Sequence, residues 1–136
     1  MSASFFDSNV LIYIASEDST KAELAEDLLA AEQAVISPQV LNECAHVLRR
    51  KLRRSWAEIH GFVGQLALTA TLHPVTGETT QLGLRLAERH GFSVWDSMIV
   101  ASALQCDARI LWTEDLHDGL LVDGRLRIAN PFAGRP

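Results

Sequence analysis

Short apolar segments alternate with longer amphipathic ones along this chain, and the two patterns predict different elements. Five short, mostly apolar segments predict strands: residues 3–6, 34–36, 71–75, 109–112 and 127–129. Pro74 limits the length of the third strand, because proline has no backbone N–H to donate to a neighbour.

The longer segments carry apolar residues at every third or fourth position, which predicts helices. The predicted helices cover residues 9–15, 20–31, 38–51, a segment after Ser55, a segment from Thr76 to near Gly91, and residues 94–104. Thr20 with Glu23 and Ser55 with Glu58 are capping boxes, and Ser37 precedes a proline in the first turn. Residues 94–104 are apolar on almost every side, so this helix should pack on both faces.

The alternation of strands and helices favours a parallel sheet covered by helices on both faces. One local signal competes with this reading at the end of the chain. Asp123-Gly124 lies between Leu120-Leu121-Val122 and Leu126-Arg127-Ile128, a pattern typical of a tight hairpin. Both readings of this segment stay open. No linker or repeat interrupts residues 1–136, so we expect one domain.

The composition is that of a globular domain, with 48% apolar and 21% charged residues among 136. The longest apolar run, residues 10–15, is too short to span a bilayer, and no secretory signal is visible. Cys44 and Cys106 both fall in apolar helical patterns and are interpreted as small buried hydrophobic residues. We therefore expect a cytoplasmic protein with no membrane partner.

A formal net charge of −5 argues against binding nucleic acid through an overall excess of positive charge. A nuclease can still be acidic if bound divalent cations face the phosphates. Basic residues gather in residues 49–54. This stretch is either a solvated helix end, where cations complement the helix dipole, or a contact for RNA phosphates.

Two aspartates stand at the carboxyl ends of predicted strands. Asp7 directly follows the first strand, and Asp115 follows the fourth by two residues. In open parallel sheets ligands bind at this edge. The alternative to ligand binding is a local structural role, in which Asp7 caps the next helix and Asp115 belongs to an acidic turn.

Two further acids lie in apolar helices. Glu43 is at the edge of the apolar arc of its helix, where it is either a surface residue covering the core or a ligand. Asp96 is in the opening turn of the most apolar helix. The helix dipole favours an anion there, but an isolated buried carboxylate is costly without a partner.

These acids become easier to explain together. In a doubly wound sheet the first and fourth strands commonly lie side by side, which would place Asp7 beside Asp115. Carboxylates held together repel one another and raise each other's pKa values. A hard divalent cation relieves that repulsion, and carboxylate-rich sites suit magnesium or manganese.

In this order and spacing the chain resembles the PIN-domain nucleases, and among them the VapC-type toxins of toxin–antitoxin pairs. The matching segments are residues 6–11, 37–43, 95–103, 113–116 and 130–132, spread over essentially the whole chain. The resemblance implies an α/β fold, a three-layer α/β/α sandwich whose five-stranded parallel sheet has the order 3-2-1-4-5.

The resemblance also implies the site residues. Asp7, Glu43, Asp96 and Asp115 correspond to the family's catalytic acidic quartet, with Asp7, Asp96 and Asp115 as ligands of Mg²⁺ or Mn²⁺. Asn9 and Thr113 occupy supporting positions, and Asp118 is a plausible extra ligand. The implied activity is metal-dependent hydrolysis of RNA that leaves 5′-phosphate and 3′-hydroxyl ends. The implied partners are RNA, a VapB-type antitoxin and a second copy of the chain in a homodimer.

Three alternatives compete with this hypothesis. An aspartyl-phosphate phosphatase would need a second acid two residues after Asp7, where this chain has Asn9, and a lysine late in the chain. The only lysines are Lys21 and Lys51. The other two alternatives keep the PIN fold: a nuclease of RNA maturation, or a catalytically silent scaffold that binds protein or RNA.

Overall fold

The computed structural model describes residues 2–133, in which strands and helices alternate as the sequence predicts. The strands are β1 (Ala3–Phe6), β2 (Gln33–Ile36), β3 (Thr71–Leu72), β4 (Ile110–Trp112), β5 (Leu121–Val122) and β6 (Leu126–Ala129). The helices are α1 (Ser8–Leu11), the 3₁₀ helix η1 (Ile12–Ala15), α2 (Ser19–Ala31), α3 (Pro38–Arg50), α4 (Trp56–Thr69), α5 (Gly77–His90) and α6 (Val94–Gln105).

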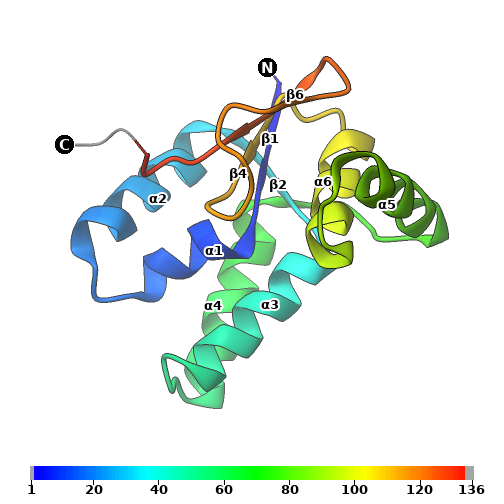
Figure 1. Cartoon of the computed structure of the whole chain (residues 1–136). Coiled ribbons are helices and arrows are strands. Elements are labelled where there is room, and N and C mark those ends of the chain that lie inside the picture. The colour runs from blue at the N-terminus through cyan, green and yellow to red at the C-terminus, as the bar shows by residue number, and fades with distance from the viewer. Residues whose placement is uncertain (1, 134–136) are drawn as a thin grey trace.

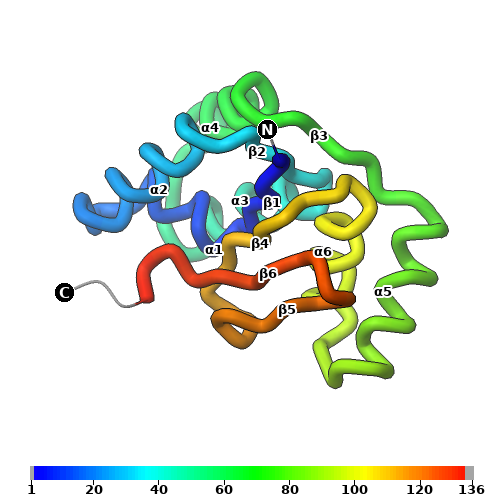
Figure 2. The backbone as a smooth tube through the Cα atoms, turned by 90° about the horizontal axis from the view of Figure 1, so that it is seen from above, coloured from blue at the N-terminus to red at the C-terminus, as the bar shows by residue number. Residues whose placement is uncertain are grey.

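Within residues 2–133 the strands form one six-stranded sheet in the order β3-β2-β1-β4-β6-β5 (Figure 2). All neighbours from β3 to β6 pair in parallel, which confirms the expected order, with β6 as the fifth parallel strand. Figure 1 shows α1 and α2 on one side of the sheet and α5 and α6 on the other. The three-layer α/β/α arrangement is therefore confirmed.

The end of the chain satisfies both readings of its sequence. β6 runs parallel to β4, and β5 pairs with it antiparallel as an extra edge strand. The hairpin turn between β5 and β6 has positive φ at both Asp123 (52°) and Gly124 (69°). That conformation matches the right-handed twist of the two strands and suits an Asp-Gly pair.

Three local predictions need correction. The first helix is split, because α1 gives way to η1 after Leu11. Asp18, rather than Thr20, caps α2: its carboxylate accepts the Lys21 amide at 3.1 Å, and its charge complements the helix dipole. β3 spans only two residues, because the ladder ends with the His73 amide and Pro74 has no N–H to extend it.

The core fills both faces of the sheet. Phe5, Phe6, Leu111 and Ile128 are fully buried on the central strands, and every residue from 97 to 104 of α6 is buried. Burial of this kind fixes the strand order, and with it the side chains that follow each strand. No helix within residues 2–133 is both long and apolar enough to cross a membrane.

Candidate active site

Asp7 lies where β1 ends and α1 begins, and it is 4% exposed. The shortest hydrogen bonds to its carboxylate come from the Ser8 amide at 2.7 Å and from the Thr113 hydroxyl at 2.9 Å. Burial raises the pKa of Asp7 to about 7, and the negative charges of Glu43 and Asp115 act in the same direction. The two hydrogen bonds offset part of this shift, so the buried carboxyl titrates near neutral pH.

Thr113 joins Asp7 to the segment that follows β4. Its hydroxyl is fully buried and accepts hydrogen bonds from the Asn9 side-chain amide at 3.1 Å and from the Asp115 backbone at 3.2 Å. The Asn9 carbonyl in turn accepts the Glu114 amide at 3.2 Å. Asn9 and Thr113 therefore hold the Asp115 segment against Asp7, a geometry that suits the supporting positions expected for them.

Glu43 comes from α3 and reaches the same site. Ser8 connects the two acids, because its hydroxyl lies 3.3 Å from the Glu43 carboxylate and 3.5 Å from that of Asp7. Glu43 is half-buried, and its pKa is raised by burial and then by the charges of Asp96 and Asp115. Sequence reasoning missed Ser8, although its position directly after Asp7 was the available signal.

Asp96 lies in the first turn of α6. The helix is capped by Ser93, whose hydroxyl accepts the Asp96 backbone amide at 3.1 Å. Burial raises the pKa of Asp96, and Asp115 is the next cause. Since Asp115 also raises the pKa of Asp7 and of Glu43, all four acids share one electrostatic environment.

Asp118 makes a hydrogen bond at the end of the chain. Its carboxylate accepts the Asn130 backbone amide at 2.8 Å, which fixes the segment after β6. The side chain is exposed, and the role of Asp118 as an extra ligand stays a prediction.

A divalent cation is the group that such a site would hold. Within residues 2–133 no three acidic, histidine or cysteine side chains are already arranged around one point as ligands. The fit therefore rests on the chemistry of the donors. Three acids with raised pKa values around Asp115 carry negative charge that lacks a cationic partner, and hard oxygen ligands suit Mg²⁺ or Mn²⁺.

A groove of about 1110 Å³ opens beside the quartet. Glu43 and Asp115 line it, together with apolar residues of η1 and α3 and, further along, Lys51. Two other members of the basic stretch have partners within the chain: Arg49 stacks on the Trp56 ring at 4.5 Å, and Arg54 donates to the Ala15 carbonyl. The stretch is thus partly structural, and Lys51 is the member that faces the groove.

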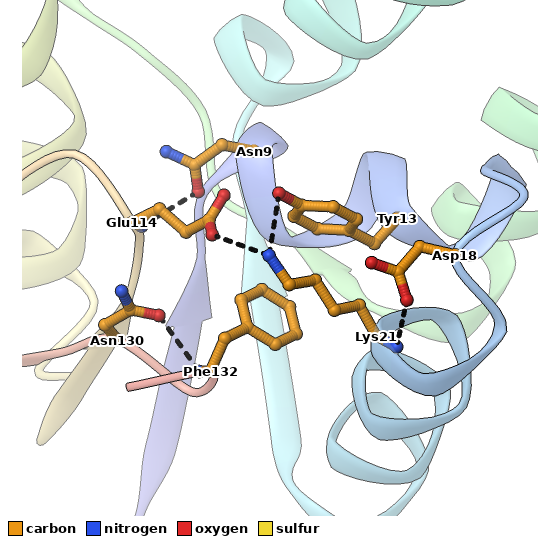
Figure 3. Close-up of polar contacts among 7 residues, drawn as sticks. All are labelled: Asn9, Tyr13, Asp18, Lys21, Glu114, Asn130 and Phe132. Carbon is orange, nitrogen blue, oxygen red and sulfur yellow. Dashed lines mark hydrogen bonds and ion pairs between the residues drawn. The ribbon is translucent and has the colours of Figure 1, made fainter. Parts of the chain in front are cut away.

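Lys21 forms a second cluster at the edge of the site, shown in Figure 3. Its ammonium group donates to the Tyr13 hydroxyl at 3.4 Å and lies 3.7 Å from the Glu114 carboxylate. It also lies over the rings of Tyr13, at 4.7 Å, and Phe132, at 5.2 Å. The hydrogen bond that Lys21 donates to the Tyr13 hydroxyl is the main reason that the pKa of Lys21 is raised. Lys21 thereby ties α2 and the chain end to the residue that precedes Asp115.

The sequence profile of the PIN domain matches residues 4–117, which is most of the chain. The chain therefore belongs to the PIN-domain family. This membership removes the phosphatase alternative, and it confirms the resemblance drawn from the five sequence segments.

Solved structures with the same fold come from toxin–antitoxin systems. VapC20 from Mycobacterium tuberculosis, described as a sarcin–ricin loop cleaving toxin, has a TM-score of 0.68 and 17% identity, over 82% of this chain and 89% of that one. A toxin–antitoxin complex from Klebsiella pneumoniae has a TM-score of 0.72 and 18% identity, over 95% and 98%. VapBC2 from Rickettsia felis, bound to a DNA fragment from its promoter, has a TM-score of 0.69 and 16% identity, over 94% of this chain and 98% of that one.

At these identities the likeness shows a shared fold. A comparison with curated protein sequences found no match. Activity must therefore be argued from the site.

Proposed function

We propose that this protein is a divalent-metal-dependent endoribonuclease and the toxin of a toxin–antitoxin pair. The observation that carries the proposal is the position of Asp7. It is buried at the carboxyl end of β1, has a pKa raised to about 7, and shares its environment with Glu43 and Asp115. Membership of the PIN-domain family and the toxin VapC20 among its structural neighbours support the same reading.

Within the site the four acids take different roles. Asp7, Asp96 and Asp115 would hold Mg²⁺ or Mn²⁺. A bound ion supplies positive charge toward the scissile phosphate and makes water more acidic. Burial raises the pKa of Glu43, and a more basic carboxylate beside the metal ligands suits a residue that accepts a proton from the attacking water. Water would form the new bond to phosphorus while the bond to the 3′-oxygen breaks, so the products would carry 5′-phosphate and 3′-hydroxyl ends.

The groove suits a single RNA strand. Its acidic end presents Glu43 and Asp115 to the phosphate that is cleaved, and Lys51 can contact a phosphate further along. Ile12, Val47 and Leu52 give the groove apolar surface, among polar residues such as Asn42 and His46. The apolar surface accommodates bases whatever their identity.

The proposed partner is a VapB-type antitoxin. The Klebsiella and Rickettsia neighbours are toxin–antitoxin complexes, and the site described above is acidic and open. An arginine or lysine of the antitoxin would pair with the carboxylates and compete with the metal ion. We also propose a homodimer as the functional unit.

Incubation of the purified chain with total RNA, followed by mapping of the new ends, tests the activity. Cleavage is expected in Mg²⁺ and should stop in excess EDTA. Asp7→Asn and Asp96→Asn should abolish it, whereas Asp118→Asn, a neighbouring acid outside the quartet, should keep it. Full activity in EDTA, or products ending in 2′,3′-cyclic phosphate, would contradict the mechanism.

Expression of the chain alone tests the role as a toxin. Cell growth should stop with the wild type and continue with Asp96→Asn. A cleavage-active protein that leaves growth unaffected would instead favour a nuclease of RNA maturation. A folded protein without cleavage would favour the silent scaffold.

A further inference from the structure

Trp95 presents its indole ring to solvent at the start of α6, directly before Asp96. It is 70% exposed, and the burial of large aromatic side chains is normally a main source of stability. The other two tryptophans are engaged: Trp56 stacks with Arg49, and Trp112 is half-buried in β4. Within residues 2–133 the ring of Trp95 has no aromatic or cationic partner, so one large flat surface is left free beside the acids.

The position of Trp95 is fixed by residues of the site itself. Its carbonyl accepts a hydrogen bond of 3.1 Å from the Gln39 side chain, and Gln39 also binds the Glu43 carboxylate. Figure 1 shows that the N-terminal ends of α3 and α6, which carry Gln39 and Trp95, lie next to each other. Ser93 caps α6 and holds the Asp96 amide on the other side. The indole is therefore carried on a rigid support between two of the four acids.

The ring lines the same groove as Glu43 and Asp115. Tyr13 is another aromatic residue of that groove, but the Lys21 ammonium group already lies over its ring. Of these two large aromatic rings, that of Trp95 stays available to a ligand. Any RNA whose phosphate reaches the carboxylates must place the adjoining nucleotides along these walls.

We infer that Trp95 is the platform on which an unpaired nucleobase next to the cleaved phosphate stacks. The inference rests on the proposed function and names a residue that selects the substrate class. Bases stack on aromatic rings whatever their identity, but only when they are not held in a duplex. Trp95 therefore favours single-stranded or looped RNA and leaves base identity largely unread.

Binding measurements without cleavage test the platform. The probes are a fluorescein-labelled oligoadenylate, an abasic oligonucleotide of the same length and charge, and the duplex form. Anisotropy is recorded in Ca²⁺, which takes oxygen ligands as Mg²⁺ does. The wild type should prefer the oligoadenylate to both other probes. Trp95→Ala should lose roughly 10-fold in affinity for the oligoadenylate and little for the abasic probe, as expected for one stacked base.

Two variants control for indirect effects. Trp95→Phe keeps an aromatic ring and should restore most of the affinity. Val94→Ala alters the neighbouring exposed residue, which does not line the groove, and should bind as the wild type does. In steady-state cleavage the Trp95→Ala variant should raise KM more than it lowers kcat.

Several outcomes would overturn the inference. Equal affinity of the wild type and Trp95→Ala for the oligoadenylate, with RNA cleavage intact, removes the platform and leaves the proposed function standing. Loss of a homodimer in light scattering on Trp95→Ala, with RNA affinity unchanged, assigns the ring to a second copy of the chain. A wild type that neither binds nor cleaves RNA removes both proposals.

Discussion

The hydroxyl of Thr113 donates a hydrogen bond of 2.9 Å to the carboxylate of Asp7, joining residues 106 positions apart in the sequence. The two residues follow β1 and β4, which pair in parallel at the centre of the sheet. This bond stabilises the ionised form of a carboxylate that burial would otherwise keep protonated. Strand pairing and the chemistry of the site thus depend on each other.

Replacement of this hydroxyl should disturb the site more than the fold. Thr113→Val keeps the shape but removes one hydrogen bond to Asp7 and leaves the Asn9 side-chain amide and the Asp115 backbone amide without this acceptor. We expect a loss of about 1–3 kcal/mol in the free energy of unfolding and a weaker affinity for Mn²⁺ in calorimetry. Thr113→Ser retains the hydroxyl and should recover both. Unchanged Mn²⁺ affinity in Thr113→Val would show that the network does not position the acids.

Stability should depend on pH through Asp7. Its folded pKa of about 7 lies above the ordinary value of 3.8, so between these values the folded state binds more protons than the unfolded state. In chelator, wild-type stability should therefore rise as the pH falls through 7. Above pH 7, Asp7→Asn should be the more stable protein, by roughly 1–2 kcal/mol after the loss of hydrogen-bond geometry. A variant that is less stable than the wild type at pH 8 would indicate that Asp7 has a structural role.

Addition of Mg²⁺ should make the wild type more stable than variants that lack one of the acids of the quartet. An ion that binds only the folded wild type stabilises it by mass action, by about 2.7 kcal/mol at a hundred times its dissociation constant. Thermal melts in Mg²⁺ and in EDTA should differ for the wild type and for Asp118→Asn, and should coincide for Asp96→Asn. The same shift in all three proteins would place the ion outside the quartet.

Lys21 should control the order of the segment that carries Asp115. Lys21→Met keeps apolar contact with the Tyr13 and Phe132 rings but removes the charge that faces Glu114. We expect faster hydrogen exchange at the Glu114 and Phe132 amides, measured by NMR, and recovery in Lys21→Arg. Arg85→Met, on an exposed part of α5, serves as the charge-matched control. Equal exchange rates in Lys21→Met and the wild type would exclude this role.

Much of this protein is determined by local sequence. Periodicity and capping residues predict nearly every helix and strand, because hydrogen bonds within a few residues and the burial of one face decide them. The same reasoning finds Asp7 and Asp115 at strand ends and Asp96 in the first turn of the most apolar helix. Where two local signals overlapped, in residues 120–129, both proved right, since β6 has a different neighbour on each side.

Tertiary structure decided which side chains meet. Local sequence does not predict the contact of Ser8 with Glu43, of Lys21 with two aromatic rings, or of Asp118 with the Asn130 amide. Each contact joins elements whose distance depends on the strand order and on how helices pack across the sheet. Burial is likewise a property of the whole fold, and it is what raises the pKa of Asp7 to about 7. The sequence by itself therefore determined the elements and the identity of the four acids. The environment that the four acids share and the free face of Trp95 arise only from long-range packing. The physical reason is that desolvation and charge repulsion act between residues that are far apart along the chain.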